Sequence, residues 1–307
     1  MKEWVFNILS FISIALIAAM LYLYWFMPFN DVEFITKPEY RGNSNFSLGG
    51  ANVLQFYENL RYPSERISYR IDNVCNLQRK ADMEWAFETI ENLTILDFYP
   101  VITNEEIFAT CENKIKTDER FFVAGEGGPT NITKTENFNV ILNGGILLLR
   151  ESECEKPNVA VHELLHALGF DHSQNPNNIL YNISKCHQTI GDDVIETINK
   201  IYSVESKSDL SFENVSASMD GRYLNVNATI RNNGLKVSDK SKMKIYADNK
   251  FQKEVDVEPM QIGFGVTLTF KNIFVSDLSV NEVKILIDTS SEELNKLNNE
   301  IVLEIKK

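Results

Sequence analysis

The chain has 307 residues, a formal net charge of −13 at pH 7 and 44% hydrophobic residues. This length and apolar content are sufficient for two domains, each with a core of its own. The acidic balance and the absence of basic runs argue against a nucleic-acid-binding protein, because phosphate backbones are bound by a local excess of Lys and Arg.

Residues 4–29 carry no charged side chain and exceed the ~20 apolar residues that a helix needs to cross a bilayer. A cleaved signal peptide, which is the alternative, has a shorter apolar core of about 7–15 residues and a small-residue cleavage site. We therefore predict an uncleaved transmembrane signal anchor. Lys2 precedes the segment and acidic residues follow it, which favours residues 1–3 in the cytoplasm and the remainder outside the cell membrane.

Four cysteines, Cys75, Cys111, Cys154 and Cys186, are widely spaced, and none belongs to a CxxC pair. An even number at such spacing indicates two disulfides formed in an oxidising compartment. The alternative is four buried free thiols.

Residues 30–60 are polar, with little periodicity, and we expect a linker or stalk there. Ordered structure begins at "RISYRID", which alternates as a half-buried strand does. A helix is predicted over "NLQRKADMEWAFETIENLT", where Leu77, Ala81, Trp85 and Thr89 recur every four residues.

Strand-forming residues then occur in "TILDFYPVI", "RFFVAGEGGPT" and "FNVILNGGILLL". In the third segment, Gly144 and Gly145 suggest a turn or bulge between two short strands. A second helix should begin at Pro157 and end at Gly169, and "DDVIETINKIYS" predicts a third. Together these elements predict a mixed α/β domain over residues 61–206.

From residue 207 onward the composition changes to short apolar alternations separated by turn signals. Roughly seven strands in about 100 residues are typical of a small β-sandwich. We therefore expect a second, all-β domain over residues 207–307.

The segment "VHELLHALGFDHSQNPNNILY", residues 161–181, contains three of the four histidines. His162 and His166 are four residues apart and so project from one face of a helix, where they can bind one zinc ion. Gly169 allows the chain to turn after the helix, so that His172 can return as a third ligand. The fourth histidine, His187, we expect at the surface.

Three protein ligands leave one position on zinc for water, as in catalytic sites. Zinc lowers the pKa of such a water towards about 7, and Glu163 is placed to act as general base and then as general acid. A bare HExxH pattern recurs by chance, but the extended spacing uses three of only four histidines. The leading hypothesis is therefore a zinc endopeptidase. The alternatives are a catalytically weak surface binding or adhesion protein with a zinc-stabilised domain, and a hydrolase of non-peptide amides.

The motif "HELLHALGFDHS" resembles that of the metzincin metallopeptidases, and specifically of the matrixins, which carry serine at the position of Ser173. The segment "AFETIENLTILDFYPV" also resembles the first helix and second strand of matrixin catalytic domains. The resemblance covers about residues 61–205. It implies a twisted five-stranded sheet, a cleft above the zinc helix, and peptide or protein substrates bound alongside an edge strand. By order in the chain, we expect that edge strand within residues 138–149.

Two features depart from the resemblance. Matrixins place a methionine in a tight turn beneath the zinc, followed by Tyr-Pro, whereas this chain has Leu180, Tyr181 and Asn182 there. Leucine matches methionine closely in volume and apolarity, and such swaps cost less than about 1.5 kcal/mol, so we expect activity to be kept. No cysteine precedes Cys75 in this sequence, so a cysteine-switch latency mechanism is not expected.

Cys154 and Cys186 flank the zinc helix, and a bridge between them would clamp the site. Four cysteines allow three pairings, and we expect this bridge together with Cys75–Cys111. The C-terminal region resembles CARDB-type adhesion modules, which are Ig-like sandwiches common on prokaryotic surface proteins. The complete prediction is one transmembrane helix, an α+β metzincin-like catalytic domain and an all-β Ig-like sandwich in a membrane-anchored, externally facing peptidase.

Overall fold

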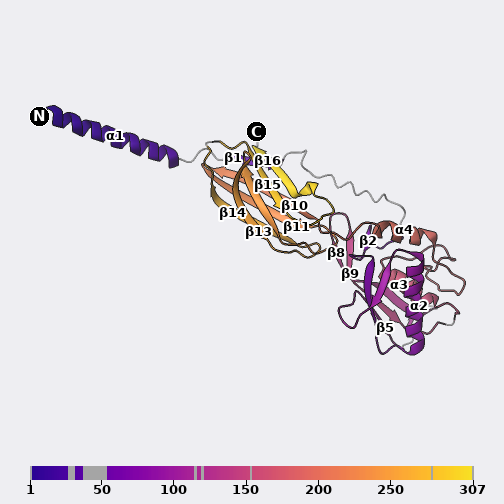
Figure 1. Ribbon diagram of the computed structural model, residues 1–307. Coiled ribbons are helices and arrows are strands. Elements are labelled where there is room, and N and C mark those ends of the chain that lie inside the picture. The colour runs from indigo at the N-terminus through magenta and orange to yellow at the C-terminus, as the bar shows by residue number, and fades with distance from the viewer. Residues whose placement is uncertain are drawn as a thin grey trace.

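The computed structural model describes residues 2–26, 32–36, 54–113, 116–118, 121–152, 154–277 and 279–305. They form an N-terminal helix, an α/β domain and a C-terminal β domain (Figure 1). Helix α1 spans Lys2–Phe26, and its segment Phe6–Leu23 is apolar enough to cross a membrane, with a mean hydropathy of 2.2. A signal sequence would pass the same test of length and composition.

The α/β domain begins at Leu54 and contains three helices and eight strands among its described residues. In chain order they are β2 (Leu60–Arg61), β3 (Arg66–Ile71), α2 (Leu77–Leu93), β4 (Asp97–Pro100), β5 (Ile107–Cys111), β6 (Lys116–Asp118), β7 (Phe121–Val123), β8 (Gly125–Lys134), β9 (Asn139–Leu148), α3 (Asn158–Ala167) and α4 (Asp192–Tyr202). The main sheet has six strands rather than the expected five, in the order β2-β9-β5-β3-β4 with β8 paired to β9, because the short strand β2 also joins it. Within the main sheet, the strands β2, β3, β4, β5 and β9 run parallel and β8 is antiparallel to β9, whereas β6 and β7 form a separate antiparallel pair.

Strand β8 is the edge strand on the side of the sheet nearest α3, which corrects the expectation of an edge strand within residues 138–149. That segment is β9, which lies inside the sheet between β5 and β8. The glycine pair does not interrupt β9. A Cβ on Gly144 would lie 2.3 Å from the Tyr62 hydroxyl, so this glycine permits close packing rather than a turn.

Helix α2 begins where predicted, because the Asn76 side chain accepts a hydrogen bond from the Arg79 backbone N–H at 3.0 Å. Its buried face differs from the predicted stripe. Leu77 is 88% exposed, whereas Arg79 is buried and donates to the carbonyl oxygens of Glu112 and Leu148. Burial of Arg79 is compensated by backbone acceptors, which hydropathy patterns do not reveal. The buried residues of α2 are Arg79, Asp82, Met83, Ala86, Phe87 and Ile90.

Both predicted disulfides are present. Cys75 is bonded to Cys111, which ties the start of α2 to the end of β5. Cys154 is bonded to Cys186, so the segments on the two sides of α3 are joined. The free-thiol alternative is therefore excluded.

The C-terminal β domain is one continuous antiparallel sheet of eight strands in the order β13-β12-β15-β16-β1-β10-β11-β14, so the expected Ig-like sandwich of two sheets is not confirmed. Seven strands come from the C-terminal region: β10 (Leu210–Asp220), β11 (Tyr223–Asn232), β12 (Ser241–Ala247), β13 (Lys250–Val257), β14 (Gly265–Phe274), β15 (Glu282–Asp288) and β16 (Glu300–Ile305), with a short 3-10 helix, Leu297–Asn299, before β16. The end strands β13 and β14 contact one another, so the sheet wraps around a single apolar core.

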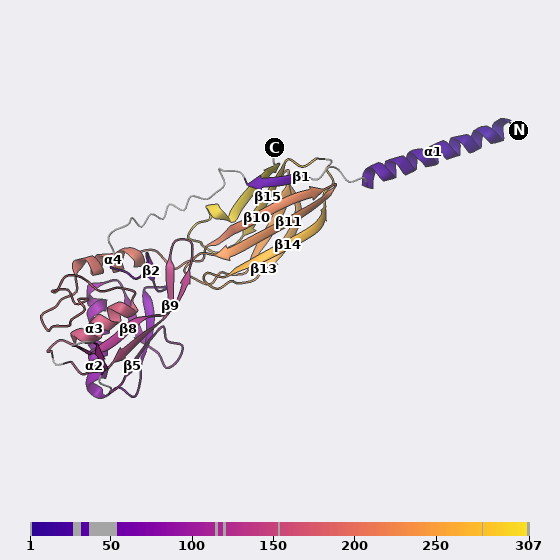
Figure 2. The same cartoon turned by 180° about the vertical axis from the view of Figure 1, so that it is seen from behind.

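The eighth strand, β1 (Val32–Thr36), comes from the segment expected to be a linker. It lies between β10 and β16 and runs antiparallel to both, with Phe34 opposite Ala217 on one side and Ile305 on the other (Figure 2). Phe34 is 6% exposed and belongs to the C-terminal core. Residues 30–31 and 37–53 of the expected linker lie outside the described residues, and residues 54–60 already pack on the α/β domain.

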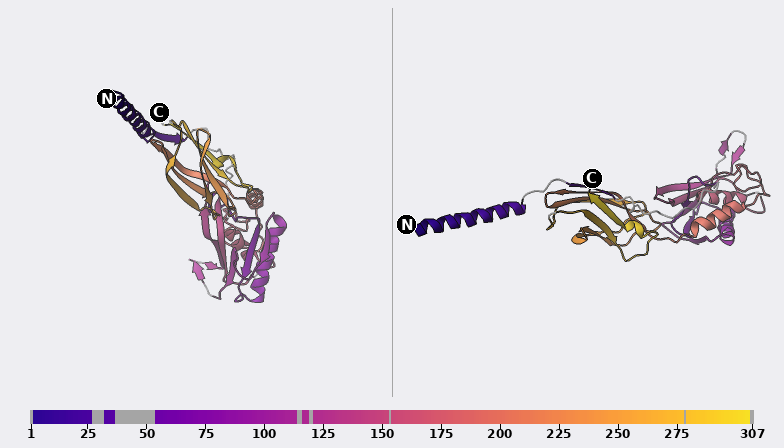
Figure 3. Two further views of the ribbon diagram at one scale, coloured as in Figure 1. Left: turned by 60° about the vertical axis from the view of Figure 1, so that its left-hand side comes forward. Right: turned by 90° about the horizontal axis from the view of Figure 1, so that it is seen from above.

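The two domains meet at the hairpin that joins β8 to β9 (Figure 3). Phe138 and Val140 from this hairpin pack against Leu235 and Ile262 of the C-terminal β domain. The edge strand of the α/β domain therefore continues directly to the domain junction.

We predict that Phe34→Ala destabilises the C-terminal β domain by about 3–5 kcal/mol, because it deletes a buried aromatic ring. Native-state hydrogen exchange of β10 and β11 amides in the full-length protein measures this loss. The matched control is Phe251→Ala, since Phe251 is 56% exposed on β13 and should change stability by less than about 0.5 kcal/mol. Equal exchange rates in both variants would show that β1 does not stabilise the sheet.

Candidate metal centre

Helix α3 and the turn that follows it bring together the three predicted histidines. Gly169 has φ +99° and ends the helix, with its N–H donating to the His166 carbonyl and the Phe170 N–H donating to the Leu165 carbonyl. This is the paired bonding of a Schellman C-cap, in which glycine tolerates the backbone angle that other residues resist. The turn redirects the chain so that His172 returns beside the helix.

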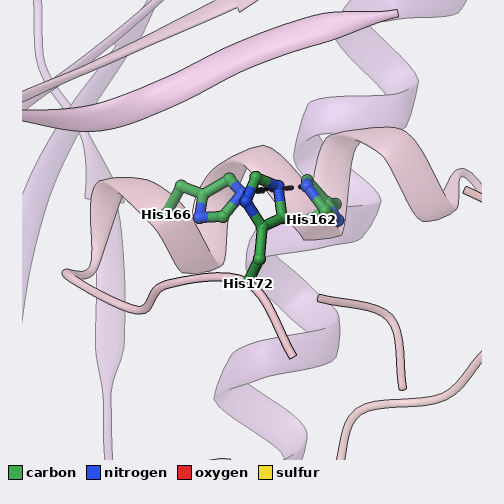
Figure 4. A group of neighbouring side chains, drawn as sticks. All are labelled: His162, His166 and His172. Atoms are coloured by element: carbon green, nitrogen blue, oxygen red, sulfur yellow. Dashed lines mark hydrogen bonds between the residues drawn. The ribbon is translucent and has the colours of Figure 1, made fainter. Parts of the chain in front are cut away.

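The three imidazole rings converge on one point (Figure 4). The Nε2 atom of His166 lies 2.9 Å from Nε2 of His162 and 3.3 Å from Nε2 of His172. One ring nitrogen from each histidine lies within 4.8 Å of the others. His162 and His166 are buried, whereas the side chain of His172 is 47% exposed, so the cluster opens to solvent on the His172 side.

Backbone carbonyls fix the orientation of the two helical histidines. Nδ1 of His162 donates to the Ile179 carbonyl at 2.6 Å, and Nδ1 of His166 donates to the Phe170 carbonyl at 2.7 Å. Because a carbonyl can only accept, each Nδ1 carries the proton and each neutral ring presents a lone pair at Nε2. Because neither Nε2 atom carries a hydrogen, the Nε2 atoms of His162 and His166, 2.9 Å apart, cannot form a hydrogen bond and their lone pairs repel. A cation between them resolves this contact, and zinc suits a set of three imidazole nitrogens.

The electrostatic environment keeps these rings neutral. Burial, followed by the neighbouring His166, lowers the pKa of His162 to about 4, and burial also lowers the pKa of His166. Neutral imidazole is the form that binds metal, so both rings are in the binding form at neutral pH.

Glu163 follows His162 on α3 and is 6% exposed. Burial, with a smaller contribution from the charge of Glu126, raises the pKa of Glu163 to about 8. A cation bound at the histidine cluster would favour the carboxylate form of Glu163, and a carboxylate at this position can accept a proton and then return it.

Glycines let the edge strand β8 approach Glu163 closely. A Cβ on Gly127 would lie 2.2 Å from the Glu163 carbonyl oxygen, and a Cβ on Gly125 would lie 2.7 Å from Cγ of the Glu163 side chain. The sequence "AGEGG" by itself predicts only a strand. Its clustered glycines were the available signal that a backbone must approach another element closely here.

Leu180 occupies a tight turn that is bonded to the loop of the third histidine. The Tyr181 N–H donates to the Asn178 carbonyl at 3.0 Å, and the Ser173 N–H donates to the Leu180 carbonyl at 2.9 Å. The Leu180 side chain is fully buried in the core of the α/β domain. The same turn provides the Ile179 carbonyl that orients His162. Leucine therefore fills the predicted apolar position.

Residues 54–56, expected to be linker, support the site. The Phe56 N–H donates to the Gly169 carbonyl at 3.0 Å, and the Asp171 N–H donates to the Leu54 carbonyl at 2.9 Å. The Phe56 ring stacks on His166 with ring centroids 5.9 Å apart. No periodicity marks so short a segment, so the sequence did not predict this contact. His187 is exposed, as predicted.

We predict that two adjacent glycines of β8 differ in how well they tolerate replacement by alanine. Gly127→Ala should lower the free energy of unfolding by about 1–3 kcal/mol, because the new methyl group meets backbone atoms of α3. Gly128→Ala is the matched control, because a Cβ there meets no atom within 4 Å, and it should change stability by less than about 0.5 kcal/mol. Urea unfolding measures the stability of both variants. A similar loss of stability in the two would contradict the close approach of β8 to α3.

Comparison with known proteins agrees with this site. A family model for the Astacin peptidases matches residues 55–261, which include the whole histidine cluster and about two thirds of the chain. No curated protein matches the chain. Astacins are metzincins, but the more specific matrixin assignment is not supported by this match. The chain therefore belongs to the astacin family, whose members are zinc-dependent metallopeptidases.

Proposed function

We propose that this protein is a membrane-anchored, externally facing endopeptidase, with His162, His166 and His172 as zinc ligands and Glu163 as general base and acid. The observation that carries the proposal is the position of buried Glu163, between the histidine cluster of α3 and the edge strand β8. A purely structural zinc site would have no use for a buried carboxyl group at that position.

The register of β8 supports binding of an extended peptide. The Leu149 N–H donates to the Ala124 carbonyl, so these two residues form a hydrogen-bonded pair of the antiparallel ladder. Because such pairs alternate along a ladder, the backbone groups of Gly125 and Gly127 point away from β9. They face the side of β8 on which no described residue forms a neighbouring strand, next to Glu163, and a peptide can add there as a further strand.

The chemistry follows from the side chains at this edge. Bound zinc supplies a Lewis acid that polarises a carbonyl group and lowers the pKa of water. Glu163 removes a proton from the attacking water at a carboxylate oxygen and then donates it to the leaving nitrogen. Backbone groups of β8 hold the peptide in an extended conformation beside this carboxylate.

The N-terminal segment supports anchoring to a membrane. Helix α1 has the length and hydropathy of a single span, and the two disulfides are typical of an oxidising exterior. Only residues 27–31 separate α1 from β1, so at most about 20 Å of chain joins the helix to the C-terminal β domain. The C-terminal β domain is then an accessory domain beside the membrane, with the peptidase domain attached to it.

We predict that Glu163→Gln lowers kcat for cleavage of a peptide library by about 10²–10⁴-fold while zinc stays bound, because the amide cannot accept the proton. The full-length protein in detergent is assayed by mass spectrometry of products and by metal analysis. The matched control is Glu196→Gln, since Glu196 is an exposed glutamate on α4 and should leave the rate unchanged. A zinc-loaded wild-type protein that cleaves no peptide would refute the proposal.

We further predict that Leu180→Met preserves zinc binding and activity, with a stability change below about 1.5 kcal/mol, because volume and apolarity are kept. Leu180→Ala should cost about 2–5 kcal/mol, because it leaves a cavity next to the turn that orients His162. Thermal unfolding with and without a chelator measures both variants. If Leu180→Ala is as stable as wild type, the turn does not need an apolar side chain.

A further inference from the structure

The edge strand β8 has two ends with different surroundings. Its first residues, Gly125 and Gly127, lie against Glu163, and its last residue, Lys134, lies at the C-terminal β domain. Any peptide that pairs with the open edge of β8 therefore extends from the site towards the second domain.

The C-terminal β domain contacts this open edge directly. The Thr135 N–H donates to the Phe138 carbonyl, so these residues form a hydrogen-bonded pair at the end of the β8–β9 ladder. By the same alternation as above, the backbone carbonyl of Lys134 points away from β9, towards the open edge. There it accepts a hydrogen bond from Nη2 of Arg231 at 3.0 Å.

Arg231 is held for this contact by its own domain. It lies on β11, and its Nη1 donates to the Glu213 carboxylate at 2.8 Å. One guanidinium therefore joins an ion pair within the C-terminal β domain to the backbone of the edge strand. A charged donor makes a stronger hydrogen bond than a neutral one.

Other contacts hold the same end of β8. The Glu136 N–H donates to Oδ1 of Asn233 at 3.2 Å, which fixes the hairpin to the second domain. Gly263 passes so close to Thr133 that a Cβ there would lie 2.6 Å from the threonine hydroxyl oxygen. With the apolar cluster around Phe138, these contacts form a complete junction of apolar and polar groups.

We propose that the C-terminal β domain is part of the peptide-binding apparatus, with Arg231 as a positioning residue that closes the open edge of β8 and holds its register against α3. This inference rests on the proposed peptidase function. Between Gly127 and Lys134 the pairing of β8 with β9 shifts register from Pro129 to Ile132, so an extended substrate passes this irregular stretch before it meets Arg231.

The test compares Arg231→Met with wild type in the full-length, zinc-loaded protein in detergent. Loss of the contact should raise KM for a peptide of about 16 residues by about three- to ten-fold, with a smaller change in kcat, because binding is weakened while Glu163 is untouched. Amides of β8 should exchange with deuterium several-fold faster, since one end of the strand is released.

Two controls separate this effect from general damage. Lys250→Met removes an exposed cation whose partner Asp277 lies away from the junction, and it should change neither KM nor exchange in β8. Glu213→Gln removes the charge but keeps an amide oxygen that can accept from Nη1 of Arg231, so the guanidinium stays in place and KM should change by less than about two-fold.

Unchanged KM and unchanged β8 exchange in Arg231→Met would overturn the inference. An increase in KM in Arg231→Met without faster exchange of the β8 amides would also overturn it, because the effect would then not come from release of the edge strand. If wild type cleaves no peptide, the proposed function fails, and the exchange measurement alone decides whether Arg231 holds β8.

Discussion

The site depends on two hydrogen bonds made by the histidine ring nitrogens that do not face the metal position. His162 and His166 donate from Nδ1 to the carbonyls of Ile179 and Phe170, and these bonds set both the tautomer and the direction of each Nε2 lone pair. The carbonyls belong to segments that follow the helix, so the ligand geometry requires the chain to fold back twice. The Schellman turn at Gly169 provides the first return, and the turn that buries Leu180 provides the second.

Close approach of backbones is the second requirement, and glycine makes it possible. Strand β8 passes within contact of Glu163 because Gly125 and Gly127 lack side chains. Glu163 is thereby removed from water, which raises the pKa of its carboxyl group, while it stays next to an edge with backbone groups available for a peptide. The same packing that brings β8 close to Glu163 therefore also excludes water from its carboxyl group.

The C-terminal β domain connects three parts of the chain that are distant in sequence. It includes β1, which follows α1 after only five residues, and it bonds through Arg231 and Asn233 to the end of β8. The C-terminal β domain thereby contacts the segment after α1 on one side and the end of the edge strand on the other. Hydrogen bonds between strands and a shared apolar core provide these contacts.

The sequence by itself determined the histidine cluster, the glycine that ends α3, the metzincin class of the enzyme, the apolar N-terminal helix and a C-terminal region of seven strands. These features can be predicted from short segments of sequence, because helical spacing, turn-forming residues and strand alternation each act over a few residues. Only the tertiary structure decided that β1 joins the C-terminal sheet, that β8 rather than β9 is the edge, and that Arg79 faces inward. Strand pairing, and the burial of a charged side chain that is hydrogen-bonded to backbone carbonyls, depend on partners far away in the sequence. Local sequence patterns do not identify those partners.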